Sequence, residues 1–80
     1  MTIGEAVRLR ILALCAERDI TVNKLATICG ITQSSLSNIV SGRNRGATVT
    51  TLKKICDGLE ITIIDFFNAE LFLQLEQELR

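Results

Sequence analysis

Apolar residues recur along the chain with the three-to-four-residue spacing of amphipathic helices. Such spacing places apolar side chains on one stripe of a helix with 3.6 residues per turn. A threonine stands just before each of these segments, and its hydroxyl can accept a hydrogen bond from a backbone N–H of the first turn. The five threonines in this position are Thr2, Thr21, Thr32, Thr48 and Thr62. The pattern therefore predicts five or six helices and no sheet.

The first helix is predicted to begin after Thr2 and to end near Asp19. Glu5 stands three residues after Thr2, so the two side chains can form a Thr-x-x-Glu capping box. Arg8, Arg10 and Glu17 lie off the apolar stripe. The predicted inward residues are Val7, Ile11, Leu14 and Cys15.

The second and third helices are separated by only a few residues. The second helix is predicted to run from Thr21 to about Cys29, and Gly30 stands where a helix-ending residue adopts positive φ. The third helix follows Thr32 and ends before Gly42. The predicted inward residues of the two helices are Leu25, Ala26, Cys29, Leu36, Ile39 and Val40.

The fourth and fifth helices follow Thr48 and Thr62. In the short fifth helix, Ile64 and Phe67 are predicted to face inward. The predicted inward residues of the fourth helix are Val49, Leu52, Ile55, Cys56 and Leu59.

A last helical segment is predicted over about residues 68–80, with Asn68 as its cap and a Glu76–Arg80 pair on its surface. Its apolar stripe consists of Leu71, Phe72, Leu75 and Leu79. This stripe can pack on its own chain or on a partner, and the sequence leaves both possibilities open.

Composition narrows the class of protein. The chain has 80 residues, of which 48% are hydrophobic, and no proline, so a single all-α domain with a real core is expected. Cys15, Cys29 and Cys56 form no Cys-x-x-Cys pair and there is no histidine, so no metal or cofactor is expected. The three cysteines are instead expected to be buried free thiols in a reducing compartment. No segment has the roughly 20 apolar residues of a membrane span, and the first residues lack signal-peptide character, so a cytoplasmic protein is expected.

The charges are unevenly distributed although the net charge is zero. Residues 1–59 carry eight Lys or Arg against four Asp or Glu, whereas residues 60–80 carry one Arg against five acids. Residues 21–56 contain no acid at all. A basic surface in the middle of the chain is therefore compatible with a nucleic-acid partner, as is an ordinary solvated surface.

The segment 22–41 carries the functional signal. Leu25-Ala26, then Gly30-Ile31, then Leu36 and Ile39 are spaced as in two helices that cross through a tight turn. Ala26 allows a close approach of the helices and Gly30 permits the turn. The remaining side chains of the third helix are then polar and point outward.

This spacing resembles the helix-turn-helix of the lambda-repressor-like Cro/repressor-type (XRE) family. Residues 41–43, 51–56 and 59–67 are similar to the flanking parts of that family, so the resemblance covers roughly residues 3–67. It implies a compact five-helix lambda-repressor-like DNA-binding domain with an additional C-terminal helical segment, one domain over residues 1–80. The chain departs from the family at Val22, where a DNA-contacting glutamine is common, at Ala47, where proline is common, and at Cys29, where a larger aliphatic residue is usual.

The resemblance implies that the third helix lies in the major groove of double-stranded DNA. The residues expected to face bases are Thr32, Gln33, Ser34, Ser37, Asn38 and Ser41. Gln33 and Asn38 are the strongest candidates, because a side-chain amide can contact N6 and N7 of adenine together. The third helix has no arginine for guanine, so half-sites containing A·T pairs are expected.

The DNA backbone is expected to be held by basic and hydroxyl side chains beside the recognition helix. The expected phosphate-contacting residues are Thr21, Lys24, Arg43, Asn44 and Arg45. Lys53 and Lys54 are weaker candidates, since an ordinary solvated surface charge explains them better.

A transcriptional repressor acting as a homodimer is the leading interpretation, because a two-fold dimer reads two half-sites. The C-terminal stripe is the candidate dimer surface. An antitoxin-type DNA-binding protein that also binds a toxin through this stripe is the alternative, and a purely structural bundle is a third. No catalytic constellation and no site for a small-molecule effector are indicated.

Overall fold

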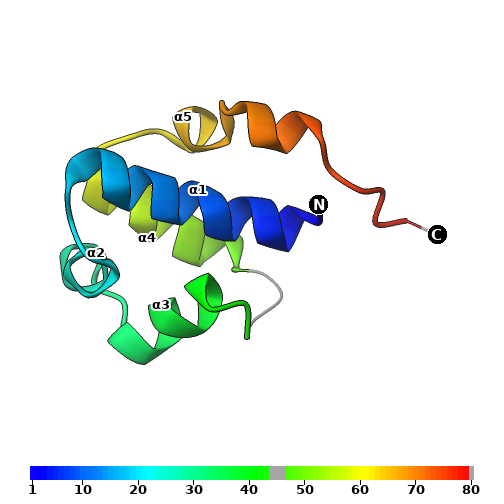
Figure 1. Cartoon of the computed structure of the whole chain (residues 1–80). Coiled ribbons are helices and arrows are strands. Elements are labelled where there is room, and N and C mark those ends of the chain that lie inside the picture. The colour runs from blue at the N-terminus through cyan, green and yellow to red at the C-terminus, as the bar shows by residue number, and fades with distance from the viewer. Residues whose placement is uncertain (44–46, 80) are drawn as a thin grey trace.

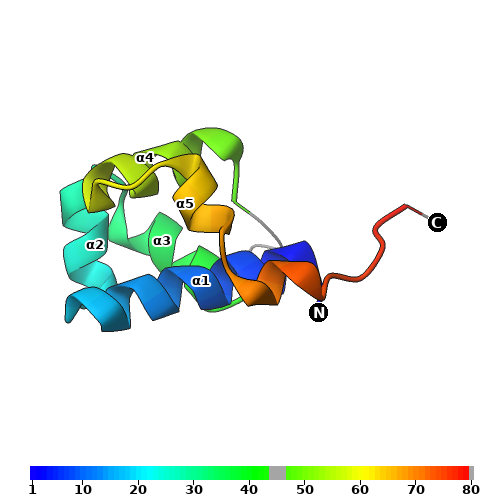
Figure 2. The same ribbon diagram turned by 90° about the horizontal axis from the view of Figure 1, so that it is seen from above.

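The computed structural model describes residues 1–43 and 47–79, and these residues form helices and no strand. The elements are α1 (Ile3–Arg18), α2 (Val22–Cys29), α3 (Gln33–Val40), α4 (Val49–Leu59), α5 (Ile63–Phe67) and the 3₁₀ turn η1 (Glu70–Leu73). Helices α3 and α5 lie on opposite sides of α1 and α4 (Figure 1). Seen from above, α5 lies over the core between α1 and α4 (Figure 2). The predicted all-α class with five helices is confirmed.

All five predicted threonine caps are present. Each hydroxyl accepts a hydrogen bond of 3.0–3.2 Å from the backbone N–H three residues later. In α1 and α5 the box is closed by Glu5 and Asp65, whose carboxylates accept from the backbone N–H groups of Thr2 and Thr62. The hydrogen bonds from the N–H and hydroxyl of Thr2 hold the pKa of Glu5 below its ordinary value. Local sequence therefore specifies where each helix begins.

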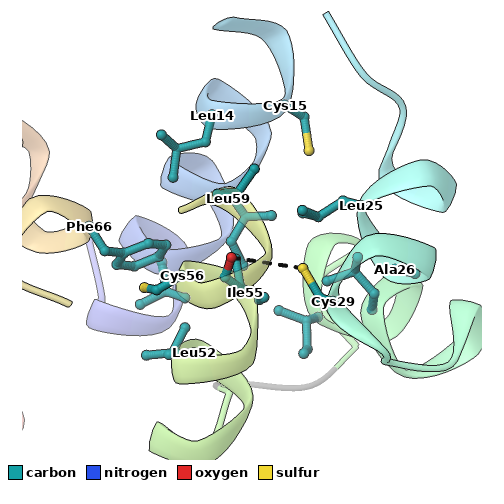
Figure 3. Packing of buried hydrophobic residues seen from close by; sticks show 14 residues of the cluster. Leu14, Cys15, Leu25, Ala26, Cys29, Leu52, Ile55, Cys56, Leu59 and Phe66 are labelled. Atoms are coloured by element: carbon teal, nitrogen blue, oxygen red, sulfur yellow. Dashed lines mark hydrogen bonds between the residues drawn. The ribbon is translucent and has the colours of Figure 1, made fainter. Parts of the chain in front are cut away.

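A single apolar core joins α1 to α5 (Figure 3). Phe66, Ile11 and Leu25 are among its largest fully buried side chains. The predicted inward stripe of α1 is confirmed, as are the inward residues Leu52, Ile55, Cys56 and Leu59 of α4. These buried side chains come from segments far apart in sequence, so the burial of their apolar surface holds the helices together.

The three cysteines are free and buried in this core. The thiol of Cys29 donates a weak hydrogen bond to the carbonyl of Ile55, with a sulfur–oxygen distance of 3.8 Å (Figure 3). Burial, together with the neighbouring Cys15 and Cys56, raises the pKa of Cys29 to about 11. The thiols are thus neutral packing groups at ordinary pH.

At Gly58, helix α4 lies too close to α2 for a side chain to fit. A methyl group at this position would lie 2.5 Å from Sγ of Cys29 and 3.1 Å from Cγ2 of Ile28. Both distances are shorter than van der Waals contact. The side chain of Cys29, where the chain departs from the family pattern, therefore packs directly against the backbone of Gly58 on α4.

Two apolar residues that were expected to be buried are exposed. Val49 is 74% exposed, because the buried side chains of α4 begin only at Leu52 and its first turn extends beyond the core. Ile64 is 80% exposed, while Phe66 is fully buried and Phe67 half-buried. A helix of five residues is too short for its sequence to define the inward face, so the prediction for Ile64 was wrong.

The C-terminal segment is less helical than expected. It forms only the single turn η1, without a side-chain cap from Asn68, and residues 74–79 have no regular secondary structure. The predicted partner of Glu76, Arg80, lies outside the described residues; Glu76 instead makes an ion pair of 3.4 Å with the amino group of Met1. A short helix at a chain end needs tertiary packing to form in water, and little is available here.

The apolar stripe of this segment, which was expected to pack on its own chain or on a partner, is only partly buried in its own chain. Phe72 packs on the core, where its ring centroid lies 4.8 Å from that of Phe67 and 6.1 Å from that of Phe66. Leu71 and Leu75 are half-buried, and Leu79 is 82% exposed. Part of the stripe therefore belongs to the core of its own chain, and part remains on the surface.

Two arginines of α1 bind the ends of other helices. Arg10 donates from Nε to the carbonyl of Phe66 at 2.7 Å and from its terminal nitrogen to the carbonyl of Asp65 at 2.9 Å. Arg18 donates to the carbonyl of Leu59 at 2.7 Å. Because the last carbonyls of a helix have no partner within it, these guanidinium groups satisfy the C-terminal ends of α5 and α4.

Within residues 1–43 and 47–79, no helix is both long and apolar enough to cross a bilayer. In the same part of the chain, no group of three or more His, Cys, Asp or Glu side chains could hold a metal ion.

Candidate nucleic-acid interface

The turn between α2 and α3 has the geometry that the sequence pattern predicted. Gly30 ends α2 in the left-handed region, with φ of 69°, and the N–H of Ile31 donates to the carbonyl of Ala26 at 3.0 Å. Ala26 and Leu36 are buried where the two helices meet, and Ile39 anchors the far end of α3. The inner side of α3 is therefore held firmly against α1 and α2.

The outer side of α3 is polar and faces solvent. Gln33, Ser34 and Ser37 are exposed, and Asn38 is half-buried. None of these four side chains makes a hydrogen bond in the described part of the chain, so their donors and acceptors are available to another molecule. Helix α3 itself lies on the outside of the molecule, on the other side of α1 from α5 (Figure 1).

Two of the candidate base-contacting residues already use their hydroxyl groups. The hydroxyl of Thr32 accepts from the N–H of Ser35 and donates to the Ser35 hydroxyl at 2.7 Å. The hydroxyl of Ser41 donates to the carbonyl of Asn38 at 3.3 Å. Both lie at the ends of α3, where they stabilise the helix. Gln33, Ser34, Ser37 and Asn38 are consequently better placed to read bases than Thr32 and Ser41.

Three of the five candidate phosphate-contacting residues lie within the described part of the chain. Thr21 caps α2, and Lys24 is exposed in the first turn of the same helix. Arg43 is exposed just after α3, whereas Asn44 and Arg45 lie outside the described residues. The structure thus brings Thr21, Lys24 and Arg43 to the two ends of the helix-turn-helix.

Not every cation of residues 1–59 is available to DNA. Arg10 and Arg18 are engaged with backbone carbonyls. Sequence reasoning missed this role, because Arg10 was noted only as lying off the apolar stripe and the partners are 41 to 56 residues away. Lys53 pairs with Asp57 one turn along α4, and this hydrogen bond raises the pKa of Lys53. The pairing makes Lys53 a poorer phosphate ligand than Lys54, which is exposed and unpaired in the described residues.

The charge distribution leaves α2 and α3 without acids. Residues 21–56 contain none, and Asp57, the first acid that follows, is neutralised by Lys53. The acids that follow Asp57 lie at the end of α4, in α5, in η1 and in residues 74–79, and of these segments α5 and η1 lie on the side of the molecule opposite α3 (Figure 1). A polyanion that approaches α3 therefore meets hydroxyls, amides and cations rather than carboxylates.

Two short helices crossed at a glycine turn, with a polar and acid-free outer helix, define a helix-turn-helix DNA-binding domain. Comparison with known proteins agrees with this class. A family model described as the Cro/C1-type HTH DNA-binding domain matches residues 10–70, so the chain belongs to that family. The expected resemblance to Cro/repressor-type proteins is thereby confirmed.

Two similar proteins extend the comparison. The chain is 38% identical over 58 residues to the HTH-type transcriptional repressor RghR of Bacillus subtilis (strain 168), a match that covers 72% of this chain and 40% of RghR. The chain thus spans well under half the length of this curated relative. Among solved structures, prophage Lp1 protein 11 superposes with a TM-score of 0.78 at 35% identity, over 86% of this chain and 91% of that chain.

Proposed function

We propose that this protein represses transcription by binding an operator as a homodimer, with α3 in the major groove of each half-site. The observation that carries the proposal is the exposed amide and hydroxyl face of α3, which Leu36 and Ile39 hold in a fixed orientation. An α-helix fits the major groove, where side-chain amides distinguish base pairs by hydrogen bonding. The similarity to the repressor RghR supports repression rather than activation.

The size of the domain is compatible with a two-fold dimer on DNA. Its principal extents are 37 × 24 × 21 Å, and successive half-sites lie about 34–36 Å apart, one turn of the duplex. Two copies placed side by side can therefore present two α3 helices to one face of the DNA. Each copy reads a few base pairs, and the pair supplies a site long enough to be specific.

Selection of bound duplexes from a random DNA pool tests the proposal. We expect the recovered sequences to form a palindrome whose half-sites contain A·T pairs, because α3 carries amides and hydroxyls but no arginine. Recovery of duplexes without any common sequence would contradict specific recognition. A single unrepeated half-site would contradict the homodimer alone.

Substitutions on α3 test which residues read the bases. Gln33→Ala and Asn38→Ala should each weaken operator binding by about 1–3 kcal/mol, the usual value of a bidentate amide–base contact, and leave the melting temperature nearly unchanged, at least for the exposed Gln33. Affinity is measured by fluorescence anisotropy on the selected operator. Glu17→Ala, at an exposed position of α1 outside both the helix-turn-helix and the C-terminal segment, is the control. Unchanged affinity in both α3 variants would reject the assignment of α3 as the reading helix.

The antitoxin alternative uses the same DNA-binding face and adds a protein partner. The exposed Leu73 and Leu79 are the observation in its favour, since apolar side chains on a surface can mark a binding site. Co-purification of a small protein encoded beside this chain would support the alternative. The alternative would be contradicted if the chain binds its operator with full affinity but does not bind the small protein encoded beside it.

A further inference from the structure

Three connections between helices share one local sequence and one backbone geometry. In each, a residue in the left-handed region is followed by an isoleucine and then by the capping threonine of the next helix. The φ angles are 55° at Asp19, 69° at Gly30 and 59° at Glu60. The N–H of the isoleucine that follows donates in each case to the carbonyl five residues earlier, at 2.9–3.0 Å. The connections that contain Asp19 and Glu60 are therefore a matched pair, each with an acid at the same place in the same turn.

The two acids lead into different parts of the molecule. Asp19 stands between α1 and α2, the first helix of the helix-turn-helix, whereas Glu60 stands between α4 and α5. In Figure 1 the first connection descends from α1 to α2, and the second rises to α5, on the side away from α3. Both side chains are exposed. Of the two, Asp19 is therefore the acid beside the candidate nucleic-acid interface.

Asp19 also lies at the border of the acid-free stretch of the chain. This stretch, residues 21–56, is preceded by Asp19 and followed by Asp57. Asp57 pairs with Lys53, whereas Asp19 makes no ion pair in the part of the chain that the structure describes. The adjacent Arg18 donates instead to a backbone carbonyl at the end of α4. The negative charge of Asp19 thus has no direct ionic partner among the described residues and stands just before the first turn of α2.

We propose that the carboxylate of Asp19 repels the DNA phosphates that bind at the start of α2, and so lowers the affinity of this domain for DNA of every sequence. The inference rests on the proposed contacts of Thr21 and Lys24 with phosphate, and it names a residue that opposes them. The Cα atoms of Asp19 and Thr21 are at most about 7.6 Å apart. This distance is shorter than the roughly 10 Å over which 0.1 M salt screens a charge, so the repulsion reaches a phosphate held by Thr21.

An acid at this position acts on one component of binding. Phosphate contacts supply the sequence-independent part of the affinity, whereas base contacts select the operator. Asp19 lies outside α3, so its charge changes the first component and leaves the base contacts as they are. Asp19 therefore limits how tightly the domain holds DNA in general, and not which sequence it selects.

Asp19→Asn and Glu60→Asn test the proposal as a matched pair. Asparagine tolerates the left-handed region, and each substitution removes one negative charge. Affinity is measured by fluorescence anisotropy on the selected operator and on an unrelated duplex, from low to moderate salt. Asp19→Asn should bind both duplexes about two- to threefold more tightly at low salt, and the gain should shrink as salt rises. Glu60→Asn should show less than half of this gain, because its connection leads to α5.

Asp19→Glu separates the effect of charge from that of backbone conformation. Glutamate keeps the charge but is less suited than aspartate to the left-handed region, so this variant should bind DNA as the wild-type chain does while melting at a slightly lower temperature. The two asparagine variants should melt at or above the wild-type temperature, which shows that they are folded.

Three results would overturn the proposal. They are an unchanged affinity in Asp19→Asn, an equal gain in Asp19→Asn and Glu60→Asn, and a gain confined to the operator. In each case the wild-type chain still binds its operator, so recognition by α3 would stand without the role of Asp19. A wild-type chain that binds neither duplex would refute the proposed function together with the proposal.

Discussion

At the residue scale, the contact between Cys29 and Gly58 sets how closely α2 approaches α4. The sulfur of Cys29 fills the space that a side chain at position 58 would occupy. Protein cores are packed as densely as organic crystals, so such a space admits no extra methyl group. Since α2 in turn supports α3, this pair of small residues contributes to the position of the recognition helix.

Gly58→Ala should destabilise the domain by about 1–3 kcal/mol through overpacking, although alanine is the better helix former. Chemical denaturation measures the loss. The double variant Gly58→Ala/Cys29→Ala should recover much of the lost stability, because the methyl group at position 58 then has room. If the two effects simply add, the contact does not limit the approach of the helices.

The buried thiol of Cys29 predicts a loss of stability at alkaline pH. Its pKa is raised from 9.0 to about 11 in the folded chain, so the unfolded chain releases the thiol proton at lower pH than the folded chain. The contribution is fully present below pH 9 and is lost as the pH rises from 9 towards 11. Melting temperatures between about pH 8 and pH 11 should therefore fall less steeply in Cys29→Ala than in the wild-type chain. Parallel curves would contradict this assignment.

At the element scale, α1 does more than supply an apolar stripe. Through Arg10 it holds the C-terminal end of α5, and through Arg18 the end of α4. A charged donor gives a stronger hydrogen bond than a neutral one, and the bond from Nε of Arg10 is partly shielded from water. The short α5 is therefore kept in place by Phe66 below and by a guanidinium group beside it.

Arg10→Gln should lower the free energy of unfolding by about 1–3 kcal/mol, since two carbonyls lose a charged partner. Arg10→Lys should recover only part of this, because an ammonium group lacks the planar fork that reaches both carbonyls. Arg8→Gln, at a neighbouring position on α1, removes no such bond to another helix in the described residues and is the control. Equal losses at both positions would mean that charge alone, and not the bond to α5, is responsible.

At the scale of the whole molecule, the charges are separated by the fold. The acid-free helix-turn-helix occupies one side, and α5 and η1, which belong to the acidic part of the chain, occupy the other (Figure 1). A molecule with zero net charge can thus present one surface that has no acids and does not repel a polyanion.

The salt dependence of binding measures this surface. Replacing Arg43 and Arg45 with alanine should weaken binding to operator and unrelated DNA alike, and should reduce the slope of log K against log salt by about 0.9 for each phosphate that is no longer neutralised. Titrations between low and moderate salt provide the slopes. The same change at Arg8 on α1 should leave the slope unaltered. A weakening confined to the operator would instead indicate a base contact.

Sequence reasoning was most successful where the cause is local. The five threonine caps, the turn at Gly30 and the inward stripe of α1 are all present as predicted. It failed where a segment is too short to specify its own inward face, as with Ile64 in α5. The extent of the last helix was overestimated because strong helix formers do not fold as a short terminal segment without packing.

The chain by itself determined where the five α-helices begin, and which side of the third helix stays polar, because capping and periodicity act over only a few residues. Tertiary structure alone decided that Phe66 enters the core, that Arg10 and Arg18 hold other helices, and that Leu79 remains outside. Those outcomes depend on which distant groups meet. Contacts between residues some 40 to 56 positions apart leave no trace in local spacing and arise only when the helices pack.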